Sequence, residues 1–388
     1  MVVTAETILH RRPISALAAP ATAAGAYPVQ HVHSLGPARI AVPPLPTGGA
    51  FFDLWPVREL PEQGMWAVPY YDSFAPPLFV LNDVTVHSSA GILAVGDTVI
   101  GESLANTVPQ VHAYRALAKG IAIQPKQVTV LPGTHISLLA GGELDYRHAL
   151  LDGLARLTAV PDNYLTAAKG LLVPGTGIAR TELFDLLDLL PSLAIHEVGR
   201  SETLRVETLV FPLSVCGESA FHPCVLDFFA RLSGNVGPSA RRLPRRFYID
   251  RRDSGVRPLR NEAELIAALA PMGFEPVRLE DLSTPEVIRL FRQAEAIVAP
   301  NGAALTNLGF CRPGCLVIEL LMDAFVDWSF RNLAALTGLR YDCVLGRAQK
   351  PWPDLSPDFH CIGWQISVQH VAAAVAHSLH PVVSARAA

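Results

Sequence analysis

The segment from Ala296 to Asn307 has the composition of a phosphate-binding loop. An apolar run ends at Pro300, and a helical pattern begins within a few residues of it. In an open α/β sheet, ligands bind just beyond the carboxyl ends of the strands. Small residues at Gly302, Ala303 and Ala304 would let a ligand approach the backbone, and the first amides of the new helix favour an anion. A tight turn that needs Gly302 for backbone reasons alone explains the segment equally well.

A cluster of arginines surrounds the apolar run that begins at Phe247. Guanidinium groups bind phosphate oxygens bidentately. Arg251 and Arg257 are therefore candidates to clamp a diphosphate and to offset the charge that develops on a leaving nucleotide. Four other members are better interpreted as solvated charge in a linker, and these are Arg241, Arg242, Arg245 and Arg246.

Glu319 lies near the end of the apolar run from Leu316 to Leu320. A carboxylate at this position of a nucleotide-binding sheet can accept hydrogen bonds from ribose hydroxyls. Because an unpaired charge is costly to bury, Glu319 needs either a ligand hydroxyl or an internal arginine. The sequence leaves both alternatives open.

His148 and Asp152 are four residues apart in a predicted helix from Asp145 to Leu157. Side chains at this spacing are adjacent on one helix face. A His and Asp pair facing a cleft could deprotonate a hydroxyl group. The residues alone favour a structural alternative, in which Asp152 pairs with Arg156 and His148 makes an interhelix contact.

Strand-like and helix-like patterns alternate regularly in the second half of the chain. Such alternation with short links predicts βαβ units and a parallel sheet covered on both faces, which is a Rossmann-like domain. The predicted strands are Phe247 to Asp250, Phe274 to Leu279, Ala296 to Pro300, Leu316 to Leu320 and Tyr341 to Leu345. The predicted helices are Glu262 to Ala270, Pro285 to Ala294, Ala303 to Phe310 and Trp328 to Thr337.

The first half of the chain is more mixed and predicts a second α/β domain. Its predicted elements are a hairpin of Leu78 to Val86 with Gly91 to Ile100, the strands Gln127 to Leu131, Gly170 to Val173 and Arg205 to Phe211, and the helix Ala179 to Leu190. Ser233 to Arg246 is the expected linker. We expect a loosely ordered leader at 1–50, domains at 51–235 and 236–360, and a helix within 361–388 that returns toward the first domain.

Composition excludes several classes of function. A chain of 388 residues that is 50% hydrophobic is long enough for two cores. Its net charge of -4 argues against nucleic-acid binding. No apolar stretch approaches the ~20 residues of a membrane helix. The six cysteines form no Cys-x-x-Cys pair, so we expect no metal site and no disulfide framework, and a cytoplasmic location.

Together these segments resemble glycosyltransferase family 61, which contains bacterial capsular-polysaccharide-type transferases. The resemblance is ordered along the chain and covers roughly residues 75–345. The residues that carry it are Tyr146, His148 and Asp152, then Arg251, Arg257, Asn261 and Glu262, then Gly273 and Phe274, then the run from Gly302 to Asn307, and finally Phe310, Gly314 and Glu319.

The resemblance implies a GT-B fold, with two Rossmann-like domains facing each other across a cleft. It implies that the second domain binds a nucleotide diphosphate sugar and that the first binds a glycan or lipid-linked acceptor, which would bring the protein to the periphery of the inner membrane. Transfer would proceed with inversion and without a metal or other cofactor. The implied donor-binding residues are Arg251, Arg257, Asn301, Gly302, Ala303, Thr306, Asn307 and Glu319.

On the same resemblance, Asp152 is the preferred general base, and His148 positions it or replaces it. Two residues depart from the family pattern, since Asn301 stands where the family usually has His, and Asp145 where it has Asn. Asn301 can donate a hydrogen bond but carries no positive charge. A sugar-nucleotide or glycan-binding protein with weakened catalysis is therefore the alternative expectation.

Overall fold

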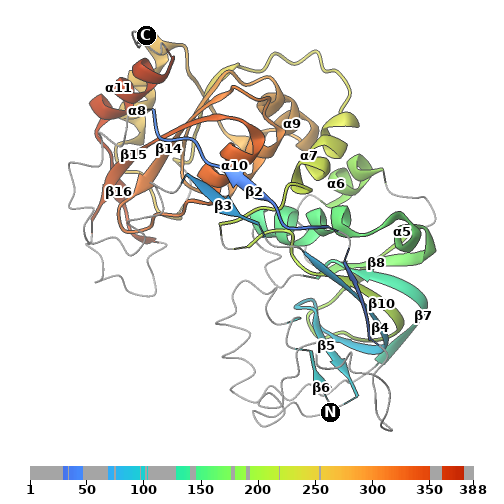
Figure 1. Ribbon diagram of the computed structural model, residues 1–388. Helices are drawn as coiled ribbons and strands as arrows, with labels where there is room; N and C mark the ends of the chain where they lie inside the picture. Colours follow the sequence, from blue (N-terminus) through green and yellow to red (C-terminus); the bar gives the residue numbers. More distant parts are fainter. Residues whose placement is uncertain are drawn as a thin grey trace, which may run out of the picture. The chain divides into compact units, whose positions relative to one another are not determined.

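The chain forms two compact units, each with its own β-sheet (Figure 1). Unit 1 comprises Met1–Ala38, Phe74–Gly217 and His222–Phe228, and unit 2 comprises Arg39–Ser73, Glu218–Phe221 and Phe229–Ala388. The predicted α/β class is confirmed. This computed structural model describes residues 29–33, 35–46, 69–73, 76–96, 98–100, 103, 128–139, 146–175, 180–188, 193–217, 219–252, 255–349 and 361–379.

The sheet of unit 1 is mixed, with one antiparallel half and one parallel half. Its order is β6-β5-β4-β10-β7-β8-β9, and β1 pairs with β4. Strands β1, β4, β5, β6 and β10 pair antiparallel, whereas β10, β7, β8 and β9 run parallel. Only the parallel half resembles a Rossmann-like sheet. The bounds are β1 (Val29–His33), β4 (Pro77–His87), β5 (Ile92–Val95), β6 (Thr98–Val99), β7 (Val128–Ser137), β8 (Ala168–Pro174), β9 (Ala194–Val198) and β10 (Thr203–Pro212).

Strand β7 continues well beyond its predicted end at Leu131. Pro132 and Gly133 read as a turn in the sequence, but they lie inside the strand, where the register with β10 shifts. Gly133 has φ +85, and its backbone N–H donates to the Glu207 carboxylate at 2.6 Å. Pro132 and Gly133 therefore form a local irregularity within β7 and do not end the strand.

The single helix predicted from Asp145 to Leu157 is divided into two short helices. A π-helix, η4 (His148–Gly153), is followed directly by a 3-10 helix, η5 (Leu154–Ala159). The division falls at Gly153, whose φ of -100 and ψ of -85 are not helical. Asp145 lies outside the described residues. Two α-helices, α5 (Asp162–Ala167) and α6 (Arg180–Leu187), complete the described helices of this region.

Two described parts of the expected leader belong to sheets, which corrects the prediction of a loosely ordered segment there. Strand β1 joins the sheet of unit 1. Strand β2 (Arg39–Ala41) pairs with β3 (Tyr70–Asp72) in unit 2, and Arg39 forms a bidentate ion pair with Asp72 across them. The rest of residues 1–50 lies outside the described residues.

Unit 2 contains the predicted parallel sheet. Its order is β12-β11-β13-β14-β15-β16, and all neighbours are parallel except β15 and β16. In chain order, the five parallel strands follow the flavodoxin-like pattern 2-1-3-4-5. The bounds are β11 (Arg246–Ile249), β12 (Glu275–Val277), β13 (Ala296–Pro300), β14 (Leu316–Met322), β15 (Arg340–Ala348) and β16 (Trp364–Gln365). All five strands predicted from the apolar runs are present.

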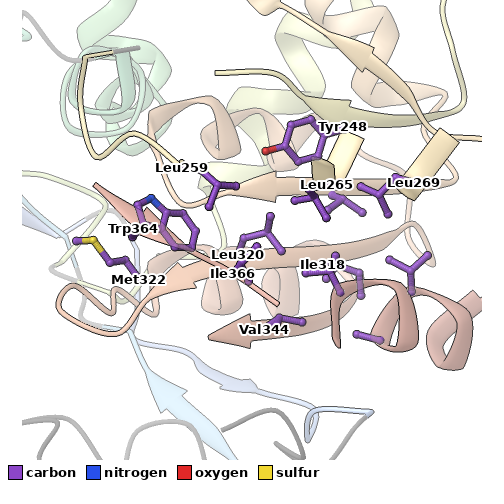
Figure 2. Close-up of a cluster of buried hydrophobic side chains, with 14 of the residues drawn as sticks. Tyr248, Leu259, Leu265, Leu269, Ile318, Leu320, Met322, Val344, Trp364 and Ile366 are labelled. Atoms are coloured by element: carbon purple, nitrogen blue, oxygen red, sulfur yellow. The ribbon is translucent and has the colours of Figure 1, made fainter. Parts of the chain in front are cut away.

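Helices cover both faces of this sheet, as the nearly continuous apolar strands require. Figure 2 shows the core on one face, where Leu265 and Leu269 of α8 pack with Ile318 and Val344 of the sheet. On the other face, Phe291 of α9 meets Phe247 edge to face at 5.4 Å between ring centroids. The helices are α8 (Glu262–Leu269), α9 (Thr284–Arg292), the 3-10 helix η8 (Ala303–Phe310), α10 (Ser329–Thr337) and α11 (Val368–Leu379).

Helix α11 packs on the sheet of unit 2, and its Val371, Ala374 and Val375 belong to the same hydrophobic core as Leu265 and Leu269. Its neighbours are α8, β14 and β15, whereas the sequence suggested a return toward the first half of the chain. Helix α7 (Val225–Gly234) contains the change from unit 1 to unit 2, just before the predicted linker. Within the described residues, no helix combines the length and the apolar character needed to cross a membrane.

Candidate functional site

The carboxyl ends of β11 and β13 form the switch point of the unit 2 sheet, because the chain turns in opposite directions from these two neighbouring strands. Arg251 follows β11, and Asn301 follows β13. The Arg251 guanidinium spans the two strand ends, since Nη1 donates to the Asn301 carbonyl at 2.7 Å and Nη2 donates to the Val256 carbonyl at 3.3 Å. A cation therefore lies where open α/β sheets bind their ligands.

Gly302 leaves open the space that the Arg251 guanidinium occupies, and its own backbone angles do not call for glycine. Its φ of 165 and ψ of 171 are extended values that any residue adopts. A Cβ atom at Gly302, however, would lie 2.6 Å from Arg251 Nη1. The alternative of a turn that needs glycine for backbone reasons is thereby set aside.

A buried carboxylate holds the backbone of Arg251. Glu262, at the start of α8, accepts hydrogen bonds from the Arg251 backbone N–H and from the Tyr248 hydroxyl, both at 2.9 Å. Burial raises the pKa of Glu262, and burial lowers the pKa of Arg251. Strand β11, its following loop and α8 are thus joined at the switch point.

Asn301 is held by Glu319 in the interior of the sheet. Asn301 Nδ2 donates to Glu319 Oε1 at 2.7 Å, and the Tyr341 hydroxyl donates to Glu319 Oε2 at 2.5 Å. Glu319 is fully buried. Two partners of its carboxylate are thus an amide and a phenol, and the sequence alternatives, a ribose hydroxyl and an internal arginine, included neither of them.

Helix η8 begins at the switch point with Ala303 and Ala304, which are half-buried. Thr306 and Asn307, two of the expected donor ligands, are buried within the helix. Asn307 Nδ2 donates to the Ala304 carbonyl at 2.9 Å. Among the described residues, the Thr306 hydroxyl has no hydrogen-bond partner. The first turn of η8 is therefore the part of the helix that a ligand can approach.

Arg257 is turned onto an aromatic ring. Its guanidinium carbon lies 4.6 Å from the centroid of Phe325, which follows β14, and its backbone carbonyl accepts a hydrogen bond from Trp364 Nε1 at 2.9 Å. Its φ is +46, an uncommon value for a non-glycine residue. Arg257 thus lies at the carboxyl edge of the sheet, but its charge is directed at Phe325.

The four linker arginines are exposed or half-buried, in line with solvated charge, and three of them pair with acidic residues of α9 and its end. Arg241 pairs with Glu286 at 3.1 Å, and Arg245 and Arg246 both reach Glu295. Arg242 is exposed. These contacts attach the linker to α9, so the cluster has a structural role apart from Arg251 and Arg257.

In unit 1, His148 and Asp152 form a hydrogen-bonded dyad within the π-helix η4. His148 Nδ1 lies 2.6 Å from Asp152 Oδ2, and the Ser214 hydroxyl donates to Asp152 Oδ1 at 3.0 Å. The two side chains of the dyad are 18% and 13% exposed, so solvent reaches both. This geometry replaces the predicted pair of Asp152 with Arg156. Single π-helical turns occur frequently at functional sites.

The hydrogen bonds of the dyad leave His148 and Asp152 with different abilities to accept a proton. Asp152 uses both carboxylate oxygens as acceptors. If Nδ1 of His148 carries the proton donated to Asp152, then Nε2 of the neutral ring is an acceptor. The arrangement therefore suits His148 as a proton acceptor that Asp152 orients.

A shallow hollow of about 540 Å³ lies on the sheet of unit 1, lined by Asn82, Asp83, Val130, Pro132, Arg205, Glu207 and Thr208. Its polar groups bond to the protein: Asp83 pairs bidentately with Arg205, and Glu207 accepts from Gly133.

Among the described residues, no group of three or more His, Cys, Asp or Glu side chains is placed to hold a metal ion.

Fold and site define an α/β protein with an arginine at a switch point and a His-Asp dyad in a second unit. Residues 146–318 match the model of a family described as Glycosyltransferase 61. Over 92 residues, the chain is 37% identical to protein O-linked-mannose beta-1,4-N-acetylglucosaminyltransferase 2 of Takifugu rubripes, covering 22% of this chain and 16% of that relative. The comparisons support the resemblance to glycosyltransferase family 61 over a region that contains the dyad and the switch point.

The structure brings Arg251 next to Gly302 and joins His148 to Asp152, and it adds Tyr341 and Ser214, to which the sequence analysis gave no site role. Both donate to a carboxylate from another part of the chain. A tyrosine at the start of a buried strand was the available signal for Tyr341. For Ser214, which follows β10, the sequence offers no distinguishing signal.

Proposed function

We propose that this protein is a glycosyltransferase that moves a sugar from a nucleotide diphosphate sugar to a glycan or lipid-linked acceptor with inversion. The observation that carries the proposal is Arg251, a cation fixed at the switch point within the region that matches the family. Units 2 and 1 would act as the donor and acceptor domains of a GT-B enzyme. A cytoplasmic site of action, with a lipid-linked acceptor at the membrane surface, fits this proposal.

The proposed chemistry is a single displacement. The acceptor hydroxyl loses its proton to a base and attacks the anomeric carbon from the face opposite the diphosphate. The bond from that carbon to the phosphate oxygen breaks, and the nucleoside diphosphate leaves with the bonding electrons. Arg251 and the first amides of η8 would stabilise the charge on the leaving group.

Release of nucleoside diphosphate from a panel of nucleotide sugars, with and without a glycan extract, tests the function. We expect Arg251→Met to lower the rate strongly, because it removes the cation at the switch point. Arg252→Met is the matched control, because Arg252 pairs with Asp250 and its side chain is 52% exposed. Equal rates in both variants, or no turnover by the wild-type protein with any donor, would contradict the proposal.

We propose that His148 is the general base and that Asp152 orients it, which reverses the order suggested by the family resemblance. We expect His148→Ala to lower the transfer rate by about 10²-fold to 10⁴-fold. Asp152→Asn should retain more activity than His148→Ala. The opposite order would return the role of base to Asp152.

We further propose that transfer requires no metal ion, because Arg251 and the helix end supply positive charge at the leaving group. Turnover measured after dialysis against EDTA, with and without added Mg²⁺ or Mn²⁺, tests this point. Activity that depends on an added ion would overturn it.

Asn301 motivates a second candidate, a binding protein with weakened catalysis. Its amide is engaged by Glu319 and only 7% of the residue is exposed, so it offers no positive charge to a leaving group. Binding of a nucleotide sugar by calorimetry without any turnover would favour this candidate. A gain of turnover in Asn301→His would indicate that the missing imidazole limits catalysis.

A further inference from the structure

Arg257 is held in an uncommon backbone conformation by hydrogen bonds to two consecutive carbonyl groups. Its φ of +46 lies in the left-handed region, which a non-glycine residue rarely adopts. The Val256 carbonyl accepts from Arg251 Nη2 at 3.3 Å, and the Arg257 carbonyl accepts from Trp364 Nε1 at 2.9 Å. The Trp364 backbone N–H in turn donates to the Pro258 carbonyl at 3.1 Å. Backbone strain that the surrounding structure fixes in this way is typical of ligand-binding positions.

The ring of Phe325 is held in place by the turn that carries it and by the core of unit 2. The turn follows β14, and in it the Phe325 backbone N–H donates to the Met322 carbonyl at 2.8 Å. Asp323 attaches the turn to the end of β15, since its backbone N–H donates to the Gly346 carbonyl at 3.0 Å. The Phe325 side chain packs against the hydrophobic core that contains Met322 and Trp364 (Figure 2). The ring is therefore in position before a ligand arrives.

Arg257 and Phe325 bring two planar groups together beside the cation of the switch point. The Arg257 guanidinium carbon lies 4.6 Å from the centroid of the Phe325 ring. Both residues are half-buried, so solvent reaches the pair. The carbonyl that holds Arg251 Nη2 belongs to Val256, the residue directly before Arg257. The pair is thus adjacent to the group that would bind a diphosphate.

The chemistry of this pair suits a flat ring better than a phosphate group. A phosphate is bound by N–H groups directed at its oxygens, whereas the guanidinium of Arg257 lies over an aromatic ring. Nucleobases stack on aromatic side chains and on arginine guanidinium planes. In a nucleoside diphosphate, a single ribose joins the base to the phosphates, so a base site must lie close to the diphosphate site. The pair meets both requirements.

We propose that Arg257 and Phe325 form a stacking site for the base of a nucleoside diphosphate, while Arg251 and the first turn of η8 bind its phosphates. Arg257 then determines the affinity for the nucleoside and does not clamp the diphosphate, which was the role expected from the sequence. The stacking site rests on the proposed function for the identity of its ligand, but it requires only binding and no transfer of sugar.

Calorimetric titration of the full chain with two kinds of ligand tests the stacking site. Inorganic pyrophosphate supplies phosphates without a base, and the diphosphates of uridine, guanosine, cytidine and adenosine add a base. Arg257→Lys keeps the charge but removes the planar group, and Phe325→Leu removes the ring. Phe325→Tyr keeps the ring. Arg260→Lys is the matched control, because Arg260 is exposed in the same loop. Circular dichroism identifies the variants that fold.

We expect Arg257→Lys and Phe325→Leu to weaken binding of the preferred nucleoside diphosphate by about 5-fold to 100-fold, because each removes a stacking group. Both variants should bind pyrophosphate like the wild type. Phe325→Tyr and Arg260→Lys should bind both ligands like the wild type, and Arg251→Met should weaken binding of both.

Two results would overturn the proposal. Equal losses of affinity for pyrophosphate and for the nucleoside diphosphate would assign Arg257 to the phosphates or to a purely structural contact with Phe325. An unchanged affinity for the nucleoside diphosphate in the folded variants would exclude stacking. If Phe325→Leu does not fold, Arg257→Lys decides between these outcomes alone.

Turnover separates the stacking site from the proposed function. If the variants show the expected losses but the wild-type protein transfers no sugar, the function fails and the stacking site stands. If the wild-type protein transfers sugar but neither variant loses affinity for the nucleoside diphosphate, the stacking site fails and the function stands. A wild-type protein that binds neither pyrophosphate nor any of the four nucleoside diphosphates overturns both.

Discussion

At the scale of single residues, the switch point depends on a close approach of a side chain to a backbone. Arg251 crosses from the end of β11 to the end of β13, and the space it uses is the space a side chain at residue 302 would fill. The position of the Arg251 guanidinium therefore depends on the absence of a side chain at residue 302. A substitution at either residue should disturb the same anion site.

Gly302→Ala should weaken binding of a nucleoside diphosphate by about tenfold or more, because the new Cβ atom displaces the Arg251 guanidinium. Isothermal titration calorimetry measures this directly. Gly255→Ala is the matched control, since a Cβ at Gly255 meets no atom within 4 Å. Equal affinities in the two variants would show that Arg251 is not part of the site.

Tyr341→Phe should lower the free energy of unfolding by about 1–3 kcal/mol, because the buried Glu319 carboxylate loses a donor at 2.5 Å. Chemical denaturation followed by circular dichroism provides the measurement. Tyr70→Phe is a suitable control, because Tyr70 is 41% exposed. If the two variants unfolded at the same denaturant concentration, the hydrogen bond to Glu319 would have little net effect.

The sequence predicted the residues of the switch point better than their roles. Arg251 and Gly302 follow apolar strands, and the parallel sheet rule brings such positions to one edge. The hydrogen bonds of Glu319 could not be predicted, because one partner follows β13 and the other begins β15. The choice between Asp152 and His148 as base depends on Ser214, which is 62 residues away in the chain from Asp152.

At the scale of elements, a strong local sequence signal predicted where a helix begins. Helix α9 begins with a capping box, in which Glu286 accepts from the Ser283 backbone N–H at 2.9 Å, as the sequence Ser-Thr-Pro-Glu suggests. The π-helical turn of η4 was beyond prediction, because the same residues also fit an ordinary helical pattern. Packing of Leu150 and Leu151 in the interior accompanies the wider turn.

Ser283→Ala should lower the free energy of unfolding by about 1 kcal/mol, since it removes one half of the capping box of α9. Urea denaturation measures the change. Ser239→Ala, in the exposed linker, removes only a hydrogen bond from the Arg241 backbone N–H and should stay within about 0.5 kcal/mol of the wild type. A larger effect at Ser239 than at Ser283 would contradict this assignment.

At the scale of the whole molecule, stability should fall on mild acidification because of His87. Burial lowers the pKa of His87 to about 4, and among the described residues neither ring nitrogen has a hydrogen-bond partner. Between the unfolded pKa of about 6.5 and the folded pKa, only the unfolded chain binds the proton. The free energy of unfolding should therefore be fully developed above about pH 6.5 and fall by up to about 3 kcal/mol toward pH 4.

Denaturation of His87→Leu across this pH range provides the measurement. The variant should lose most of the acid sensitivity that His87 contributes, because an apolar side chain of similar size leaves no group to protonate. His377→Leu, at an exposed position on α11, is the control and should follow the wild type. Identical pH dependence in all three proteins would exclude His87 as the source.

The chain passes between the two units several times before its long final run through unit 2. Arg331 of α10 donates to the carbonyl of Pro43, and Asn332 donates to the carbonyl of Ser219. A recombinant fragment that starts at Phe229 would lack both acceptors and leave two buried polar side chains without them. A separately expressed C-terminal piece would therefore need both the β2–β3 segment and a start before Ser219, and during synthesis α10 must be complete before either carbonyl finds its donor.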